Sequence, residues 1–199
     1  MMPSAGTAGT VDLVERVTQT ARTVMLTFGV ERNSCILACR VVADALAYYG
    51  VEAKPQAVHA SAYAPATGMA YVTAGGNTRA DLGGLWSGHL VLQAAGLLID
   101  PSSDQMAREG LPVGLLVAPL PEPERTPWTF GSQAGVQVQY QPINDVSWRL
   151  APAWQPDRTS RGLVVLTIRM LRAEDAAGRV TGADIETRLR ALLDKAGYR

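Results

Sequence analysis

Residues 35–49 read Cys-Ile-Leu-Ala-Cys-Arg-Val-Val-Ala-Asp-Ala-Leu-Ala-Tyr-Tyr and are followed by Gly50. The stretch is apolar nearly all round, apart from Arg40 and Asp44, whose i, i+4 spacing allows an ion pair on one helix face. A helix that is apolar on all sides belongs in the interior of a domain. The sequence therefore predicts a buried helix that ends at Gly50 and around which the other elements pack.

The segment before this helix predicts another helix. Apolar residues recur at helical spacing from Thr10 onward, and Gly29 can end the helix. Residues 1–9 are small and polar, lack the basic and apolar regions of a signal peptide, and are expected to be a disordered tail. A chain of 199 residues is long enough for one sizeable core, so a single domain is predicted over residues 10–199.

Downstream of residue 50, alternating and short apolar runs predict an antiparallel sheet. The predicted strands cover residues 56–63, 88–94, 97–100, 113–120, 136–143 and 163–171. Ala95-Gly96 is typical of a tight hairpin turn between two of them. The glycine-rich segment 64–87 and the proline-rich segment 119–127 are expected to be exposed loops, and a closing amphipathic helix is predicted from Thr181. The expected class is α+β.

The charge composition does not indicate a nucleic-acid or membrane partner. The 18 basic residues equal the 18 acidic residues, so there is no electrostatic argument for nucleic acid. No run approaches 18 uncharged apolar residues, so no membrane span is expected. Cys35 and Cys39 lie one helical turn apart, where a disulfide would strain the backbone, which indicates free thiols and a cytoplasmic location.

Cys35 stands at the predicted start of the buried helix, after Asn33 and Ser34, either of which can cap it. At a helix N-terminus the dipole and the free backbone N–H groups favour a thiolate, and the same N–H groups can stabilise an oxyanion. Cys35 is therefore the candidate nucleophile. Cys39, one turn deeper on an apolar helix, is expected to be a core residue.

His89 heads one strand of the predicted hairpin and Asp100 closes the other. A turn centred on Ala95-Gly96 brings the two residues within about two positions of each other, although a slip of one residue would put them on opposite faces. The predicted roles are His89 as base and then acid, and Asp100 as the group that holds the imidazole tautomer. Asp104 is the alternative acid, and His59 is expected to be structural.

These residues resemble those of transglutaminase-like and papain-like thiol enzymes. The run from Cys35 to Pro55 is similar to their nucleophile helix and the strand after it, and Gly88-His89-Leu90-Val91 and Leu98-Ile99-Asp100-Pro101-Ser102 resemble their histidine and aspartate strands. Arylamine N-acetyltransferases also have cysteine, histidine and aspartate in this order along the chain. No Arg-Gly-Gly precedes Cys35 here, which argues against that family. The resemblance, over residues 30–105, implies a central helix on an antiparallel sheet and acyl transfer through a Cys35 thioester, without metal or organic cofactor.

The implied substrate is a peptide, a protein or a small acyl compound, with hydrolysis and transfer both open. Asn33, Ser34 and Trp86 are the candidate oxyanion or pocket residues, and segment 64–87 is the candidate lid. Two other functions remain open at this stage. One is a non-catalytic binding or structural module that retains the fold, and the other is an acetyltransferase that uses an acyl-coenzyme donor.

Overall fold

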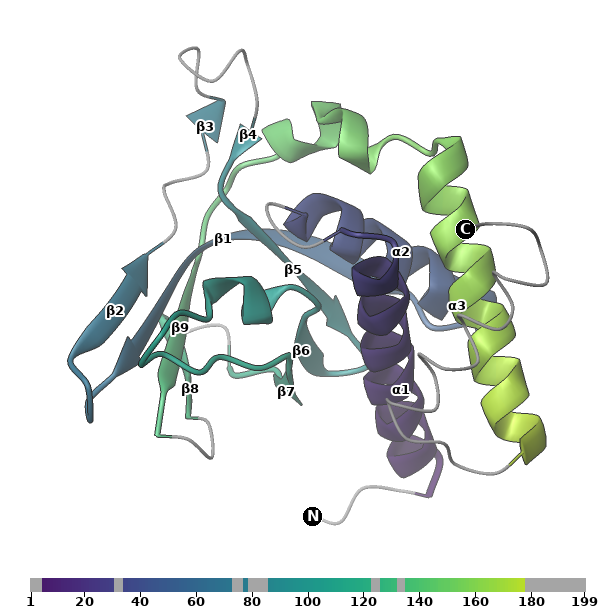
Figure 1. Cartoon of the computed structure of the whole chain (residues 1–199), viewed down its shortest axis with the longest axis horizontal. Coiled ribbons are helices and arrows are strands. Elements are labelled where there is room, and N and C mark those ends of the chain that lie inside the picture. The colour runs from purple at the N-terminus through teal and green to yellow at the C-terminus, as the bar shows by residue number, and fades with distance from the viewer. Residues whose placement is uncertain are drawn as a thin grey trace.

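The computed structural model describes residues 5–30, 34–72, 77–78, 86–122, 126–131 and 135–177 (Figure 1). The helices are α1 (Ala5–Thr27), α2 (Cys35–Tyr48) and α3 (Arg158–Ala177), with 3-10 helices η2 (Ser103–Met106), η3 (Ser147–Leu150) and η4 (Pro152–Trp154). The strands are β1 (Ala53–Ala64), β2 (Met69–Val72), β3 (Asn77–Thr78), β4 (Trp86–Ser87), β5 (His89–Ala94), β6 (Leu97–Asp100), β7 (Leu116–Pro119), β8 (Trp128–Gly131) and β9 (Gln137–Pro142).

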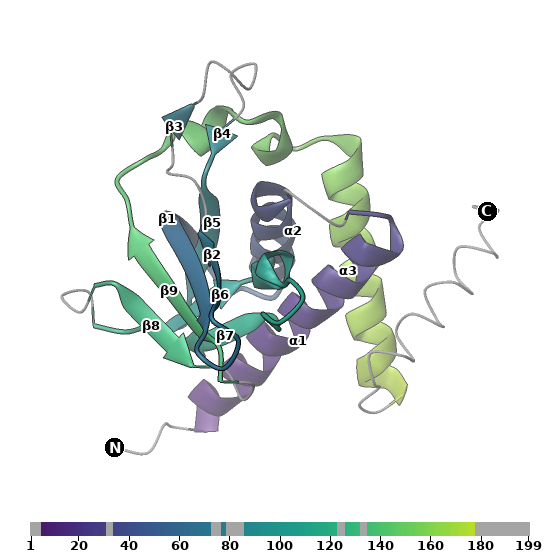
Figure 2. The same ribbon diagram turned by 60° about the vertical axis from the view of Figure 1, so that its left-hand side comes forward.

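The main sheet is antiparallel throughout and has the strand order β7-β6-β5-β1-β9-β8, with β2 paired to the end of β1. Helix α2 contacts β5 and β1 on one side and α1 and α3 on the other. Figures 1 and 2 show all three helices on the same side of β1 and β5. The predicted α+β class with an antiparallel sheet is therefore confirmed.

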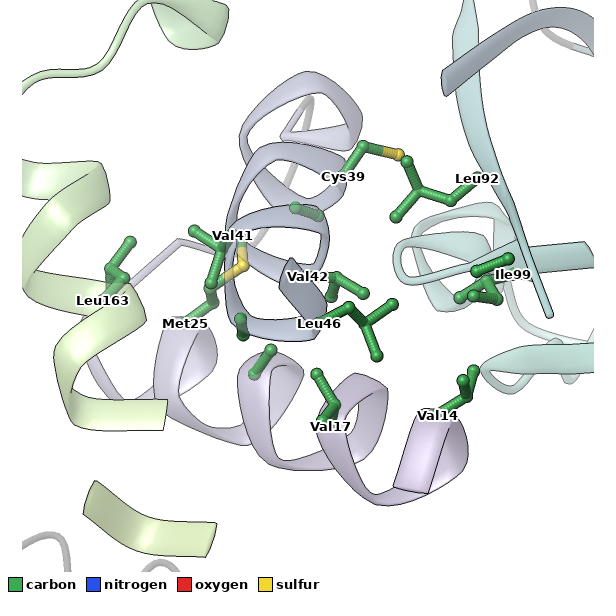
Figure 3. Close-up of a cluster of buried hydrophobic side chains, with 14 of the residues drawn as sticks. Val14, Val17, Met25, Cys39, Val41, Val42, Leu46, Leu92, Ile99 and Leu163 are labelled. Atoms are coloured by element: carbon green, nitrogen blue, oxygen red, sulfur yellow. The ribbon is translucent and has the colours of Figure 1, made fainter. Parts of the chain in front are cut away.

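The sheet separates two apolar cores. The helix-side core includes Val17, Met25, Val41, Val42, Leu46, Leu92, Ile99 and Leu163, most of which Figure 3 shows around α2. The far-side core lies on the opposite face and includes Val58, Val91, Leu98, Val136, Val138 and Tyr140. Because side chains alternate along a strand, neighbouring residues of β5 and β6 enter different cores.

Helix α2 has the features that its sequence predicts. Ala38, Cys39, Val41, Val42, Ala45 and Leu46 are fully buried. Arg40 Nε donates to Asp44 Oδ2 at 2.7 Å, which confirms the predicted i, i+4 pair. Gly50 has a φ of 77°, and Val51 N–H bonds back to the Leu46 carbonyl at 3.0 Å, so the helix ends in a left-handed glycine turn as expected.

The prediction of a strand over residues 163–171 is wrong, because this segment lies within α3. Its β-branched residues favour a strand by propensity. However, the buried residues Ser160, Leu163, Thr167, Met170, Leu171 and Glu174 follow the helical period and pack on α1 and α2. Asp157 Oδ1 accepts the Ser160 N–H at 2.7 Å and Asp157 N–H bonds to Ser160 Oγ at 3.1 Å, which is a reciprocal cap at the helix start.

Other boundaries differ from the predictions. Helix α1 begins at Ala5, within the segment 1–9 that was expected to be a disordered tail. Strand β2 lies within the expected loop 64–87, and β8 was not predicted. The closing helix from Thr181 lies outside the described residues. Within the described part of the chain, no helix is long and apolar enough to cross a bilayer.

Candidate functional site

Cys35 is the first residue of α2, and Ser34 is its N-cap. Ser34 forms no side-chain cap bond; instead, the Gln105 side chain of η2 holds it at two points. Gln105 Nε2 donates to Ser34 Oγ at 2.7 Å, and Gln105 Oε1 accepts the Ser34 N–H at 3.3 Å. The start of α2 is thus tied to the segment that follows Asp100. Asn33, the other candidate beside Cys35, lies outside the described residues.

The two thiols of α2 contact main-chain oxygens at the start of β5. Cys35 Sγ lies 3.8 Å from the Gly88 oxygen, and Cys39 Sγ lies 3.1 Å from the Leu90 oxygen. One helical turn and two strand residues have similar lengths, so α2 lies along β5 with its first turn at the beginning of the strand. Cys39 is fully buried, and burial raises the pKa of its thiol well above the ordinary value. Cys39 is a core residue, as expected, whereas Cys35 is only half-buried.

The hairpin brings His89 and Asp100 together. Leu92 pairs with Ile99 and Ala94 with Leu97, so the turn is centred on Ala95-Gly96 as predicted. His89 Nε2 lies 2.6 Å from Asp100 Oδ2, and the side chains are 6% and 0% exposed. The predicted register is confirmed, and it produces a buried imidazole–carboxylate pair.

His89 lies at an edge of β5 that β6 leaves unpaired. His89 shares the face of Val91, which belongs to the far-side core, whereas α2 covers the face of Leu92. Strand β6 pairs with residues 92–94 of β5 and not with His89. The Cys35 thiol lies near the same end of β5, 3.8 Å from the oxygen of Gly88.

The surroundings of His89 favour the imidazolium. Burial lowers the pKa of His89, but the charge and hydrogen bond of Asp100 and the hydrogen bond and charge of Cys35 outweigh it and raise the pKa to about 10. Because Nε2 is bonded to Asp100, Nδ1 is the ring nitrogen left for Cys35. His89 is therefore positively charged at neutral pH.

Asp100 is held as a carboxylate by four donors. Oδ2 accepts from His89 and from the Tyr140 hydroxyl at 2.7 Å, and Oδ1 accepts from the N–H and Oγ of Ser102 at 3.0 and 3.2 Å. Burial raises the pKa of Asp100, but His89, Tyr140 and Ser102 together bring it below its ordinary value. The Asp-Pro-Ser turn after β6 therefore supplies part of the site.

Tyr140 is the site residue that the sequence analysis missed. It is fully buried, its ring stacks on that of His89 at a centroid distance of 6.2 Å, and its hydroxyl bonds to Asp100. The alternation of Val136, Val138 and Tyr140 predicts that Tyr140 is inside, but its partner depends on the non-sequential order β5-β1-β9. Burial, followed by the nearby Asp100 charge, raises the pKa of Tyr140 well above the ordinary value.

Replacement of Tyr140 by Phe is expected to lower the free energy of unfolding by about 1.5–3 kcal/mol, the range for a hydrogen bond to a charged group. Urea denaturation at pH 7 measures the loss. Tyr63→Phe, at a tyrosine that is 45% exposed, is the control and is expected to change stability by less than about 0.5 kcal/mol. Equal stabilities of the Tyr140→Phe variant and the wild type would show that the buried hydroxyl contributes nothing.

The remaining candidates have other partners. Asp104 Oδ2 accepts from Arg22 Nε at 2.9 Å and so joins η2 to α1; Asp100, not this alternative acid, holds His89. Trp86 Nε1 donates to Asp145 Oδ2 at 3.0 Å, so its N–H is occupied. Trp86 packs, like Cys35, against the helix-side core. Within the described residues, no group of three or more His, Cys, Asp or Glu side chains is placed to hold a metal ion.

Comparisons with known proteins support the fold alone. No family model matches the sequence, and no curated protein matches it. The structure is similar to a solved one named "The crystal structure of genomics APC5867", with a TM-score of 0.51 and 14% identity, over 79% of this chain and 77% of that one. The two structures share the α+β arrangement, and the name of the solved structure states no activity.

Proposed function

We propose that the protein is a cysteine-dependent acyl-transfer enzyme, with a core of the transglutaminase-like or papain-like type in which α2 is the central helix. The observation that carries the proposal is the buried 2.6 Å contact between His89 and Asp100, with the Cys35 thiol 3.8 Å from the oxygen of Gly88, the residue before His89. A structural histidine needs no thiol beside it at a helix N-terminus. The three residue types are those of a nucleophile, a base and an orienting acid, which supports the proposal.

The first half of the reaction forms a thioester. The Cys35 thiolate attacks the carbonyl carbon of an amide or ester, and the carbonyl π electrons move to oxygen. The first N–H groups of α2 have no acceptor within the helix, and in this proposal they stabilise the oxyanion. When the tetrahedral intermediate collapses, the bond to the leaving amine or alcohol breaks, and the His89 imidazolium supplies its proton.

The second half regenerates the thiolate. Neutral His89 takes a proton from water or from an acceptor amine, which attacks the thioester carbonyl. Collapse of the second intermediate breaks the carbon–sulfur bond and returns Cys35 as a thiolate beside the imidazolium. Asp100 stays ionised throughout, since its task is to hold Nε2 and to stabilise the positive ring. Water as acceptor gives hydrolysis, and an amine gives transfer.

The test is formation of an acyl-enzyme. The protein is mixed with p-nitrophenyl acetate at pH 7, and mass spectrometry of the intact chain and of its peptides is expected to find one acetyl group, on Cys35. Cys35→Ala is expected to abolish it. Cys39→Ala is the matched control, because Cys39 lies one turn away but is fully buried, and it is expected to leave the labelling unchanged. Failure of Cys35 to acquire an acetyl group in the folded wild type would contradict the proposal.

A further inference from the structure

The main sheet ends in two strands that border one cavity. Strand β7 is at one end of the strand order and β8 at the other, yet both line the same cavity of about 610 Å³. Figures 1 and 2 show the two strands on the same side of the molecule. The lining residues are 113–118 (the approach to β7 and most of that strand), 129–131 in β8, and Val136 and Val138. The cavity therefore lies where the curved sheet leaves a gap between its ends.

The edge of β7 that faces away from β6 carries free main-chain groups. Leu120 N–H bonds to the Gly96 oxygen at 2.8 Å, in the same register as the pair Ala118 and Leu98. Because antiparallel residues alternate between bonding to one neighbour and to the other, Val117 directs its N–H and C=O away from β6. Among the described residues, no strand pairs with this edge of β7 or with the outer edge of β8. Such edges are templates for another strand.

The size of the cavity matches one short strand. Both bordering strands have four residues. A four-residue strand is about 14 Å long, occupies about 4.8 Å between its neighbours and is about 10 Å thick with its side chains, which gives about 650 Å³. The cavity volume of about 610 Å³ is close to this. A four-residue strand therefore has a volume similar to that of the cavity.

The lining restricts the chemistry of that strand. Among the described residues that line the cavity, none has a charged side chain, and Thr129 alone has a side-chain hydroxyl. A charged side chain of the ligand would lose hydration there without gaining a partner. Val136 and Val138 join the lining to the far-side core, which provides an apolar surface for alternate side chains of the ligand.

We propose that the gap between β7 and β8 binds an uncharged, extended peptide segment of another protein by strand addition. The main chain of the ligand pairs with the free edges, and its inward side chains pack on the apolar lining. This binding site is separate from the Cys35 chemistry and does not depend on it.

The probe is the neutral peptide acetyl-Val-Thr-Val-Thr-Val-amide, titrated into the full chain and followed by calorimetry. Saturable binding is expected with one peptide per chain. The matched ligand carries N-methyl groups on alternate amides, which keeps the apolar side chains but removes donors, and it is expected to bind at least about tenfold more weakly. Val117→Pro removes a free donor of β7 and is expected to weaken binding of the unmethylated peptide similarly. Val72→Pro, at an exposed position of β2, is the control.

Three outcomes would overturn the proposal. They are absence of binding, equal binding of the N-methylated peptide, and a dimer in sedimentation that the peptide does not dissociate, which would make a second copy the occupant. Circular dichroism checks that Val117→Pro is folded. If that variant does not fold, the comparison of the two peptides on the wild type decides the question alone. Repeating the titration with Cys35→Ala is expected to give the same affinity, so the result is independent of the acyl-transfer proposal.

Discussion

Replacing His89 by Ala is expected to lower the rate at which p-nitrophenyl acetate acetylates Cys35 by about 10²-fold at pH 7, the lower end of the range for loss of a general acid–base group. Two effects combine. The variant loses the positive charge beside the attacking sulfur, and it loses the group that donates and accepts the proton of each intermediate. Release of p-nitrophenolate, followed optically under single-turnover conditions, measures the rate.

The pH dependence separates this role of His89 from a purely structural one. The pKa of His89 is raised to about 10, so the imidazolium persists across neutral pH, and the loss of wild-type rate that follows deprotonation of His89 is expected only as pH approaches 10. In His89→Ala this loss of rate near pH 10 is expected to be absent, because the group that loses the proton has been removed. His59→Ala changes the other histidine of the chain, on β1, and is the matched control. Equal rates for His89→Ala and His59→Ala would contradict the catalytic role.

The His89–Asp100 pair could be predicted from sequence because one turn determines it. A turn centred on Ala95-Gly96, which the structure has, puts the two side chains within reach, whereas a slip of one residue, which the sequence left open, would have put them on opposite faces. The apolar helix at residues 35–48 was predictable for a similar local reason, since its composition, its i, i+4 pair and its terminal Gly50 all lie within one element. Local constraints were sufficient in both cases.

Contacts between distant elements could not be predicted in this way. Tyr140 reaches Asp100 because β9 pairs with β1, and β1 with β5, an order that no local pattern specifies. The strand predicted at 163–171 failed for the same reason, since packing on α1 and α2 outweighs the propensity of its β-branched residues. A local signal was nevertheless present in Asp157 and Ser160, whose spacing is that of a helix cap.

The segment from Asp100 to Met106 connects the parts of the site. Asp100 holds His89, Asp104 pairs with Arg22 of α1, and Gln105 holds Ser34 at the start of α2. Seven consecutive residues thus join the acid to the helix that carries the nucleophile. Contacts of Asp100, Asp104 and Gln105 thus help to position α2 relative to His89. Among these three residues Asp100 has the most partners, so we expect its substitution to have the widest effect.

Asp100→Ala is accordingly expected to lower the free energy of unfolding by about 3–5 kcal/mol at pH 6, the cost of removing one partner of a buried ion pair. The substitution leaves His89 buried without its counter-charge, and it removes the acceptor for Tyr140 and Ser102. Urea denaturation measures the difference. Asp44→Ala breaks the more exposed pair with Arg40 and is the control, with an expected loss below about 1 kcal/mol.

The difference in the free energy of unfolding between wild type and Asp100→Ala is also expected to depend on pH. The pKa shifts of Asp100 and His89 determine the direction of this dependence. The pKa of Asp100 is lowered by folding, so its contribution is present above about pH 3.9, the unfolded value, and is lost as pH falls through the folded value. The pKa of His89 is raised to about 10, so its contribution is complete below about pH 6.5 and is lost as pH rises toward 10. The stability difference should therefore be largest between about pH 4 and pH 6.5 and decrease on both sides. A difference that stays constant from pH 3 to pH 10 would mean that His89 and Asp100 meet as neutral groups, and the imidazolium that the proposed thiolate requires would be absent.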